Sequence, residues 1–175
     1  RRADRGAHRR NDRSLQRGRG TTTRLMIATS VTYDWVFVVH IIGAVATIIV
    51  FVAMRLAALD VARGADEATQ RSRFPERRNW AARVIHVMPV TGLIMSLSGG
   101  PSVAPSQPWV IVGLLCYIAA AGHLEARTLP EERALAATIA RDGVATRDQG
   151  RKLVRSIDTL LLIVAIAFIS MLIQY

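Results

Sequence analysis

Cysteine is almost absent from this sequence, and with it several classes of protein chemistry. The single cysteine, Cys116, excludes an intramolecular disulfide and a cysteine-based metal framework. Neither an internal repeat nor a phosphate-binding glycine motif occurs along the chain. Basic residues are also missing from three long stretches, at residues 26–54, 84–126 and 156–175. These stretches without basic residues, rather than any catalytic motif, organise the chain.

The first such stretch is long and apolar enough to cross a membrane. Residues 35–54 are about twenty apolar positions interrupted only by His40 and Thr47. At 1.5 Å per residue a helix of this length matches the roughly 30 Å hydrocarbon core of a bilayer. The chain has 175 residues, half of them hydrophobic (51%), and a mean hydropathy of +0.26. We therefore expect one domain and an integral membrane protein.

The net charge of +10 belongs mainly to the first 25 residues. Nine of the 23 basic residues lie there, against only Asp4 and Asp12. An arm of this composition cannot bury enough surface to fold, so residues 1–25 are predicted to be disordered. With no aromatic side chain to stack on a base, we expect no nucleic-acid partner. Met26 stands directly before the apolar part, which favours a natural start there; the alternative is a genuine arm that binds RNA or anionic lipid.

The other fourteen basic residues predict the topology. They fall into two groups, at residues 55–83 and 127–155. By the positive-inside rule both groups are cytoplasmic loops, so both termini of the chain that starts at Met26 lie outside. The spans are expected at residues 35–54, 80–97, 109–124 and 157–173. This predicts an all-α, four-helix bundle that spans a membrane.

The connections between the spans are also predicted. Residues 57–79 alternate in charge and indicate a solvated loop, and residues 99–108 hold three prolines and two glycines, which favours a turn. Thr128 and Glu131 have the spacing of a capping box, which would open a short helix along the membrane surface. That helix would carry Leu135 and Ile139 and end near Asp142 and Gly143.

Polar residues inside the spans are the candidates for function, because ionisable groups are costly there. A small, polar stripe suited to the bundle interior is expected on span one, at His40, Gly43, Ala44 and Thr47, and another on span three, at Gly113, Cys116, Ala120 and His123. Span two carries Arg83 and His86 one turn apart, and Pro89 is expected to kink its helix. Asp158 opens span four, where it can pair with Arg83 or a histidine.

Depth in the membrane separates the three histidines. His86 and His123 are both expected roughly 6 to 9 Å below the cytoplasmic surface, whereas His40 lies near the outer end. A bis-histidine haem b is therefore possible with His86 and His123, and His40 is an alternative outer-face site. The competing interpretation is that all three are hydrogen-bonding residues between helices, with no cofactor. No metal site is expected unless Glu125 turns inward, and no catalytic set is complete.

Four short sequence motifs, taken together with their order and spacing, carry a family resemblance. They are Tyr-Asp-Trp-Val-Phe-Val-Val-His-Ile-Ile-Gly at 33–43, Gly-Gly at 99–100, Pro-Trp-Val-Ile-Val-Gly at 108–113 and Arg-Ser-Ile-Asp at 155–158. Through these motifs, residues 26–175 resemble domain-of-unknown-function family 2269, a group of small integral membrane proteins. The resemblance implies the fold and topology, and no reaction.

The layout is also similar, more distantly, to four-helix bacterial membrane protoporphyrinogen oxidases and to copper-resistance membrane proteins of the D type. The oxidases share an early histidine, matching His40, and a Glu-Arg-Arg before the second span, matching residues 76–78. Their functionally important lysine, four residues after a tryptophan, is Gly113 here, counted from Trp109. The resemblance therefore does not carry the oxidase activity over.

Three functions remain as hypotheses. The first is a non-enzymatic accessory or structural membrane subunit, with the bilayer and a larger complex or a homo-oligomer as partners. The second is a haem-binding redox or porphyrin-handling protein. The third is a small-solute or metal-ion carrier, which is disfavoured because the spans offer no charged path through the midplane.

Overall fold

The computed structural model describes residues 5–75, 79–99 and 103–173, with side chains from residue 33 onward. Every regular element in the described part is helical. The elements in order are α1 Arg5–Arg63, α2 Glu67–Arg73, the 3-10 helix η1 Ala81–His86, α3 Val87–Ser98, α4 Pro108–His123, the π-helix η3 Leu124–Thr128, α5 Leu129–Asp142 and α6 Arg147–Ile173. The all-α prediction is confirmed.

Four segments are helical, long enough and apolar enough to cross a membrane. They are Tyr33–Arg63, Ala81–Ser98, Pro108–Asp142 and Arg147–Ile173. Each contains one of the expected spans, give or take a residue at its start, so the number and order of spans agree with the sequence. The first, third and fourth extend further than expected at the end that carries the charged residues. At 1.5 Å per residue, these three helices exceed the roughly 30 Å hydrocarbon core.

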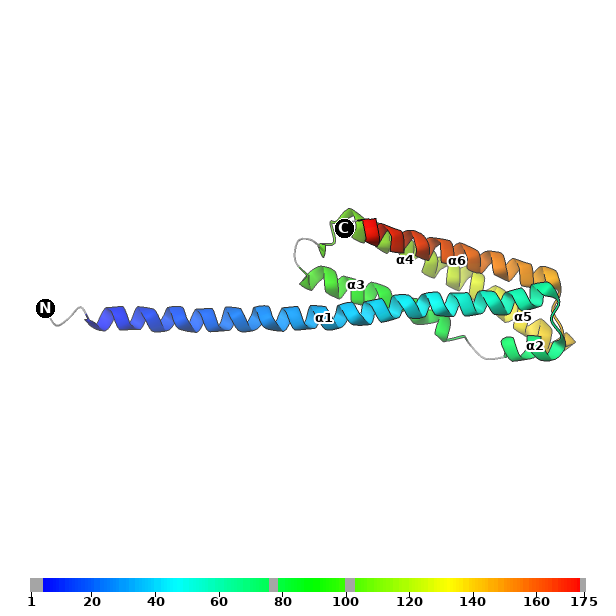
Figure 1. Ribbon diagram of the computed structural model, residues 1–175, viewed down its shortest axis with the longest axis horizontal. Helices are drawn as coiled ribbons and strands as arrows, with labels where there is room; N and C mark the ends of the chain where they lie inside the picture. The colour runs from blue at the N-terminus through cyan, green and yellow to red at the C-terminus, as the bar shows by residue number, and fades with distance from the viewer. Residues whose placement is uncertain (1–4, 76–78, 100–102, 174–175) are drawn as a thin grey trace.

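The first and last spans pack against each other and connect the other two (Figure 1). Helix α1 packs against both α6 and α3, and α6 in turn packs against α4. By contrast α3 and α4, although consecutive, contact each other very little. The helices alternate in direction, so the span that starts at Tyr33 and the span that ends at Ile173 meet the same end of the helical body.

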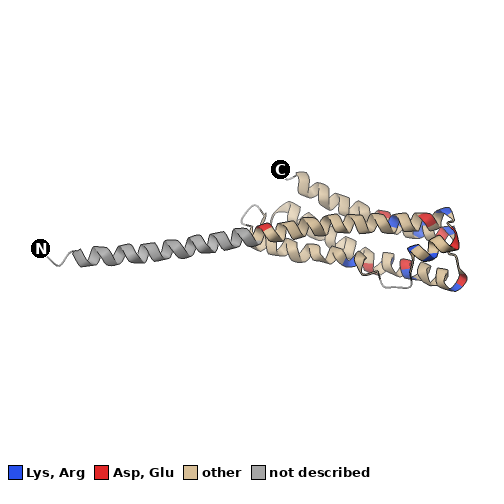
Figure 2. Ribbon diagram, turned by 60° about the horizontal axis from the view of Figure 1, so that its bottom comes forward, with Lys and Arg blue, Asp and Glu red and all other residues tan. Residues whose placement is uncertain are grey.

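Charged side chains gather at the opposite end of the body. Figure 2 shows the arginines, the lysine and most acidic residues around α2, α5, the start of α6 and the close of α1, with Asp34 alone at the other end. The buried apolar core lies at this charged end too, because it begins at Phe51 on α1 and stops at Leu160 on α6. We call this part the charged end and the part beyond it the apolar end.

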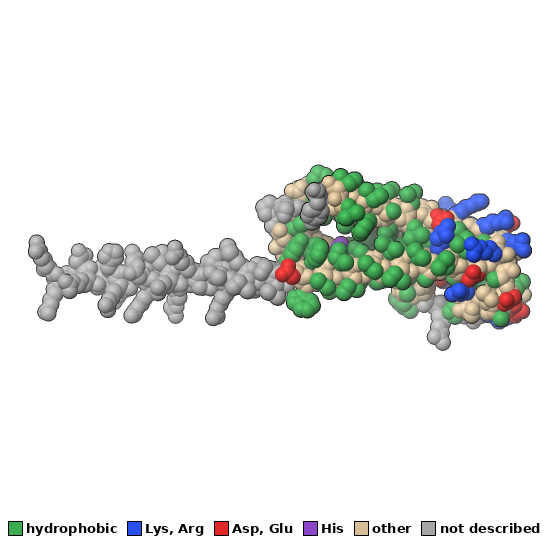
Figure 3. Space-filling view, viewed as in Figure 1, with side chains coloured by type: hydrophobic (Ala, Val, Ile, Leu, Met, Phe, Trp, Pro, Cys, Tyr) green, Lys and Arg blue, Asp and Glu red, His purple; other side chains and the backbone are tan. Residues whose placement is uncertain are grey.

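The surface of the apolar end is hydrophobic. Large apolar side chains are exposed along all four spans, among them Ile42, Leu93, Leu115 and Ile169. Figure 3 shows this apolar coat and a hollow between α1 and α6, bordered by hydrophobic side chains, with a histidine visible inside it. A coat of this kind is what lipid tails cover in a membrane protein.

Helix α5 departs from the sequence-based expectation. The chain remains helical from Pro108 to Asp142, because the π-helix η3 joins α4 to α5. No side chain caps the start of α5, and the Thr128 hydroxyl lies 2.9 Å from that of Ser156 instead. The predicted capping box is therefore wrong. The predicted end is right: Gly143 follows α5 with a φ of 86°, which favours glycine.

Residues 57–79 are also more ordered than a solvated loop. Helix α1 continues to Arg63, and α2 follows after a tight turn at Gly64. The side chains of Ala57, Val61 and Phe74 are buried in the core. Asp66 caps α2 by accepting a 2.8 Å hydrogen bond from the Thr69 backbone N–H. The segment is a packed part of the charged end, and residues 76–78 lie outside the described residues.

The predicted arm remains a prediction. Helix α1 is assigned from Arg5, but residues 1–4 and the side chains of residues 5–32 lie outside the described part of the chain. The disorder of residues 1–25 and their natural origin both stay predictions. The outer turn is partly described: α4 begins at Pro108, where a missing N–H costs nothing, and residues 100–102 are outside the description.

Candidate functional site

The polar stripe predicted on the first span faces the interior. His40, Gly43 and Thr47 are buried, and Ala44 is half-buried. The Nδ1 atom of His40 lies 2.7 Å from the Thr91 hydroxyl on α3. That hydroxyl already donates to the Val87 carbonyl at 2.8 Å, so the imidazole Nδ1–H must be the donor. The neutral ring therefore keeps Nε2 unprotonated, as an acceptor.

A second polar cluster joins η1 to the third span. Arg83 holds Glu125 with two hydrogen bonds, at 2.8 Å to Oε1 and 2.9 Å to Oε2. Two-point pairing of this kind is strong and fixes the orientation of both groups. His86 Nδ1 lies 2.9 Å from the Tyr117 hydroxyl, and the two rings meet edge to face with centroids 6.1 Å apart. His86 Nε2 lies 3.7 Å from Glu125 Oε1, beyond hydrogen-bond distance.

The third histidine links α4 to α6. His123 Nε2 lies 3.1 Å from both the backbone carbonyl and the hydroxyl of Ser156. A carbonyl oxygen can only accept, so Nε2 carries the proton and donates. Ser156 and Thr128 are both buried, and their hydroxyls complete this small interhelical network.

The aspartate at the start of span four has a different partner from either one expected. Asp158 Oδ1 accepts a 2.6 Å hydrogen bond from Arg55 Nε, at the end of span one. Arg83 is held by Glu125 instead, because both lie on the side where η1 meets the continuous α4–η3 helix. The expected pairing of Asp158 with Arg83 or a histidine is therefore wrong. Pro89 lies in the first turn of α3, just after the change from 3-10 to α-helix.

The stripe expected on the third span is only partly internal. Ala120 is buried, whereas Gly113, Cys116 and His123 are half-buried. Cys116 is a free thiol. Glu125 does turn toward His86, but among the described residues no group of three or more His, Cys, Asp or Glu side chains is close enough to hold a metal ion.

The two predicted haem ligands belong to separate networks. His86 contacts Tyr117 on α4, and His123 contacts Ser156 on α6. The structure thus places the candidates on neighbouring elements and gives each ring a protein partner. His40 forms a third network nearer the apolar end, with Thr91.

Sequence reasoning missed the partners rather than the histidines. Thr91 and Tyr117 each stand among apolar residues in a span, and that isolation was the available signal, whereas Ser156 lies between Arg155 and Ile157, just before the expected fourth span. Gln70 was missed as well: its side chain donates to the Ala65 carbonyl and accepts from the Ala145 N–H, both within 2.9 Å. Nothing in the local sequence of Gln70 points to a partner 75 residues away.

Comparison of the chain with protein-family models, with curated proteins and with solved structures finds no match. The family resemblance inferred from four short sequence motifs therefore stays a prediction.

Proposed function

We propose that the chain is a multi-pass protein of a bacterial inner membrane and a non-enzymatic accessory or structural subunit within it. Its charged end would face the cytoplasm, and both the Tyr33 and Ile173 ends of the spans would face outward. The arrangement follows from the two groups of basic residues, which the fold brings to one end of the helical body.

One observation carries the structural role: each of the three histidines with a described side chain joins two helices. His40 links α1 to α3, His86 links η1 to α4, and His123 links α4 to α6. Interhelical hydrogen bonds are worth about 0.6 to 2 kcal/mol each in membrane proteins. A polar residue used this way stabilises the packing of spans that apolar contacts alone hold weakly.

The carrier hypothesis receives less support. The ionisable side chains of the described spans lie toward the charged end, apart from His40 and from Asp34 at the opposite end. A carrier of ions or polar solutes needs polar groups through the midplane. Toward the apolar end the described residues offer His40 with its partner Thr91, and no continuing series of charges.

Haem or porphyrin handling is a second candidate, favoured by a specific feature of His40. The Nδ1–H of this residue is oriented by Thr91, which leaves Nε2 in the form that binds iron. An apolar hollow between α1 and α6 lies in the same part of the molecule as the first half of span one. For His123, haem binding through Nε2 would require the ring to leave Ser156, whereas His86 uses Nδ1 and could keep Tyr117 while Nε2 bound iron.

Matched substitutions distinguish hydrogen bonding from iron ligation. Glutamine and asparagine can replace the hydrogen bond of a histidine at Nε2 and Nδ1, respectively, but are not haem ligands of this kind. We expect His123→Gln and His86→Asn to retain most of the thermal stability of the detergent-purified protein, while His123→Ala and His86→Ala lose several degrees. We also expect no b-type band in reduced-minus-oxidised spectra of protein expressed with ample haem.

Each alternative gives a different spectrum. A band removed by His86→Asn and by His123→Gln, with His40→Asn unaffected, would overturn the structural role in favour of a bis-histidine haem. A band removed only by the His40 substitution would instead indicate the outer-face site. If the protein shows no band and is also extracted in mild detergent without any partner or second copy, the accessory role fails.

Topology is tested separately with fused reporters. A reporter after Tyr175 is expected to be active outside, and one inserted near Gly143 in the cytoplasm, since basic residues flank the latter position. Activity of the Gly143 fusion outside would overturn the proposed orientation.

A further inference from the structure

An open groove of about 820 Å³ lies at the charged end, where three separate segments meet. The end of α2 contributes Arg73 and Phe74, the start of span two contributes Trp80 and Arg83, and α5 provides the opposite wall. Asn79 Nδ2 donates to Glu132 Oε1 at 2.8 Å and ties the second segment to the third. The groove is therefore built from parts of the chain that are fixed to one another.

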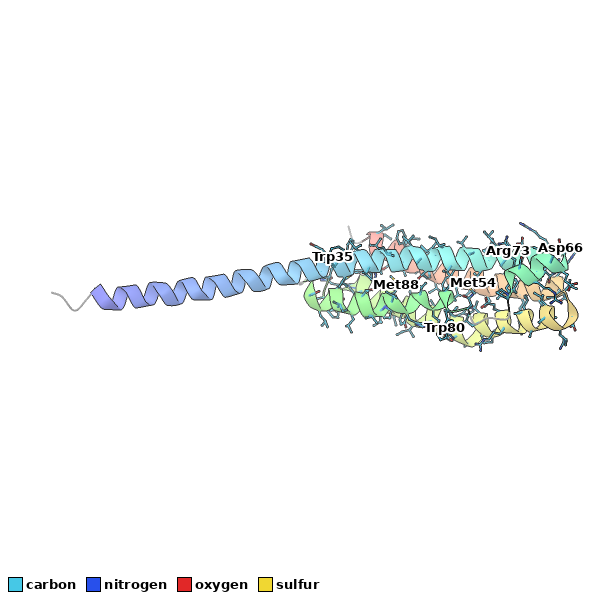
Figure 4. The ribbon with its side chains drawn as sticks, turned by 90° about the horizontal axis from the view of Figure 1, so that it is seen from below. Trp35, Met54, Asp66, Arg73, Trp80 and Met88 are labelled. Carbon is cyan, nitrogen blue, oxygen red and sulfur yellow. The ribbon has the colours of Figure 1, made fainter. Side chains whose placement is uncertain are left out.

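The groove sits at the level where the membrane-spanning part begins. Trp80 immediately precedes the apolar segment Ala81–Ser98, and 64% of its side chain is exposed. Tryptophans prefer the headgroup region of a bilayer. The Arg83 guanidinium carbon lies 5.1 Å from the centre of the Trp80 ring, in a cation–π contact. Figure 4 shows Trp80 along the body between Trp35 and Asp66.

Arginine is the main charged residue of the lining. Four arginines line the groove, and Glu132 is the one carboxylate among the described lining residues. Three of these arginines pair with carboxylates that are not part of the described lining: Arg73 with Asp60, Arg83 with Glu125 and Arg141 with Asp142. Arg133 instead donates through Nε to the Leu129 carbonyl at 3.1 Å. Arg73 and Arg133 are both bonded through Nε, and a guanidinium carries two further nitrogens that can donate to an anion.

Apolar residues also line the groove. They are Phe74, Leu129 and three alanines of α5, at positions 136, 137 and 140. Arginines together with apolar lining residues match a molecule with an anionic head and an apolar body. A soluble phosphate would use only the arginines, whereas a phospholipid would also cover the apolar residues.

We propose that this groove binds the phosphate of an anionic phospholipid from the cytoplasmic leaflet, with Arg73 and Arg133 as the main contacts. The inference rests on the membrane placement proposed above and adds a ligand site to it. Basic side chains near an anionic membrane surface contribute about 1 kcal/mol each. Removal of one such side chain should therefore weaken lipid binding about fivefold.

The test is native mass spectrometry of the full chain in detergent, titrated with phosphatidylglycerol or with phosphatidylcholine. We expect tighter binding of phosphatidylglycerol, a loss of about fivefold in each of Arg73→Gln and Arg133→Gln, and a gain in Glu132→Gln. Arg151→Gln is the matched control, because it makes the same charge change at an exposed α6 residue that is not part of the groove.

Several results would overturn the proposal. One is an equal preference for the two lipids, and another is an equal loss in Arg151→Gln, which would indicate a general charge effect. Displacement of the lipid by inorganic phosphate would assign the site to a soluble anion instead. Melting temperatures of all variants show whether a loss reflects unfolding. The reporter fusions test the membrane placement independently, so failure of the lipid site and failure of the topology give different results.

Discussion

The charged end and the apolar end of this molecule are held together in different ways. At the charged end Phe51, Val61, Leu153 and Leu160 are buried in a continuous core. At the apolar end few residues are buried, and several of those are polar or small: His40, Gly43, Thr47 and Thr91. Along α6 no residue from Leu161 to Ile173 is buried. The same helix thus takes part in a packed core and in a lipid-facing coat.

The contrast follows from the solvent on each side. Water drives apolar side chains together, and about 25 cal/mol is gained for each Å² of apolar surface that leaves water. Lipid tails are as apolar as leucine, so no such force acts between spans. Close packing of small residues and hydrogen bonds remain, and these are what α1 and α3 use at His40 and Gly43. A membrane chain of this size therefore builds its hydrophobic core at the end that water reaches.

The sharpest test of this contrast is one substitution made at both ends of α6. Leu153 is 1% exposed in the core, and Leu162 is 61% exposed on the coat. Leu153→Ala is expected to lower the free energy of unfolding by about 2–5 kcal/mol, because a cavity remains. Leu162→Ala should change it little, since lipid fills the space. Denaturant titration in detergent measures both, and equal losses would contradict the two-region description.

Two glycines provide the next test. A Cβ on Gly150 would lie 2.5 Å from the Ala62 backbone nitrogen, so α1 and α6 approach too closely there for any side chain. We expect Gly150→Ala to cost about 1–3 kcal/mol through overpacking. At Gly122 a Cβ would meet nothing within 4 Å, so Gly122→Ala should be neutral or slightly stabilising. A tolerated Gly150→Ala, seen as an unchanged melting temperature, would show that the contact is not tight.

The smallest effect concerns pH at the charged end. The Thr69 backbone N–H bond to the Asp66 carboxylate lowers the pKa of that group below its ordinary value. Because the pKa is lower in the folded state, this contribution is complete above the unfolded pKa and is lost as pH falls through the folded one. We expect the protection factor of the Thr69 amide, which is the ratio of its intrinsic exchange rate at each pH to its observed rate, to fall below about pH 4. Asp66→Asn, which caps without ionising, should remove that pH dependence but keep the protection. A wild-type rate with the same pH profile as the variant would contradict this.

Much of the fold was predictable, because the length of an apolar run and the place of arginines are local properties. The number of spans, their order and the end of α5 at Gly143 all followed from such signals. The extension of α4 through η3 into α5 did not. Residues 125–142 are amphipathic and charged, which is equally typical of a helix on the membrane surface and of one that projects from it. Only packing against α2 and α6 decides between them.

The candidate site was also predictable only in part. Histidines in apolar segments are visible in a sequence, but their partners depend on how the helices rotate against each other. The sequence analysis kept His40 apart from the other two histidines, and the structure gives His40 its own partner, Thr91. The depth of each histidine in the membrane stays a prediction. The rotation of the helices about their axes was not predicted: Asp158 pairs with Arg55, and Arg83 pairs with Glu125. An error of one residue turns a helical side chain by about 100°, which changes the neighbour completely.

The helix from Pro108 to Asp142 is unbroken, so a movement of its first half is transmitted to its second half. Its 35 residues span about 52 Å, which is roughly 20 Å more than the thickness of the hydrocarbon layer of a bilayer. Spans tilt when the bilayer becomes thinner. Because α4 and α5 are one rod, any tilt of the first swings the second, and with it the wall that carries Arg133. Spin labels on Ala137 and Arg71, measured in nanodiscs of short-chain and long-chain lipid, are expected to report a change in separation; a constant separation would mean that the π-turn bends and absorbs the motion.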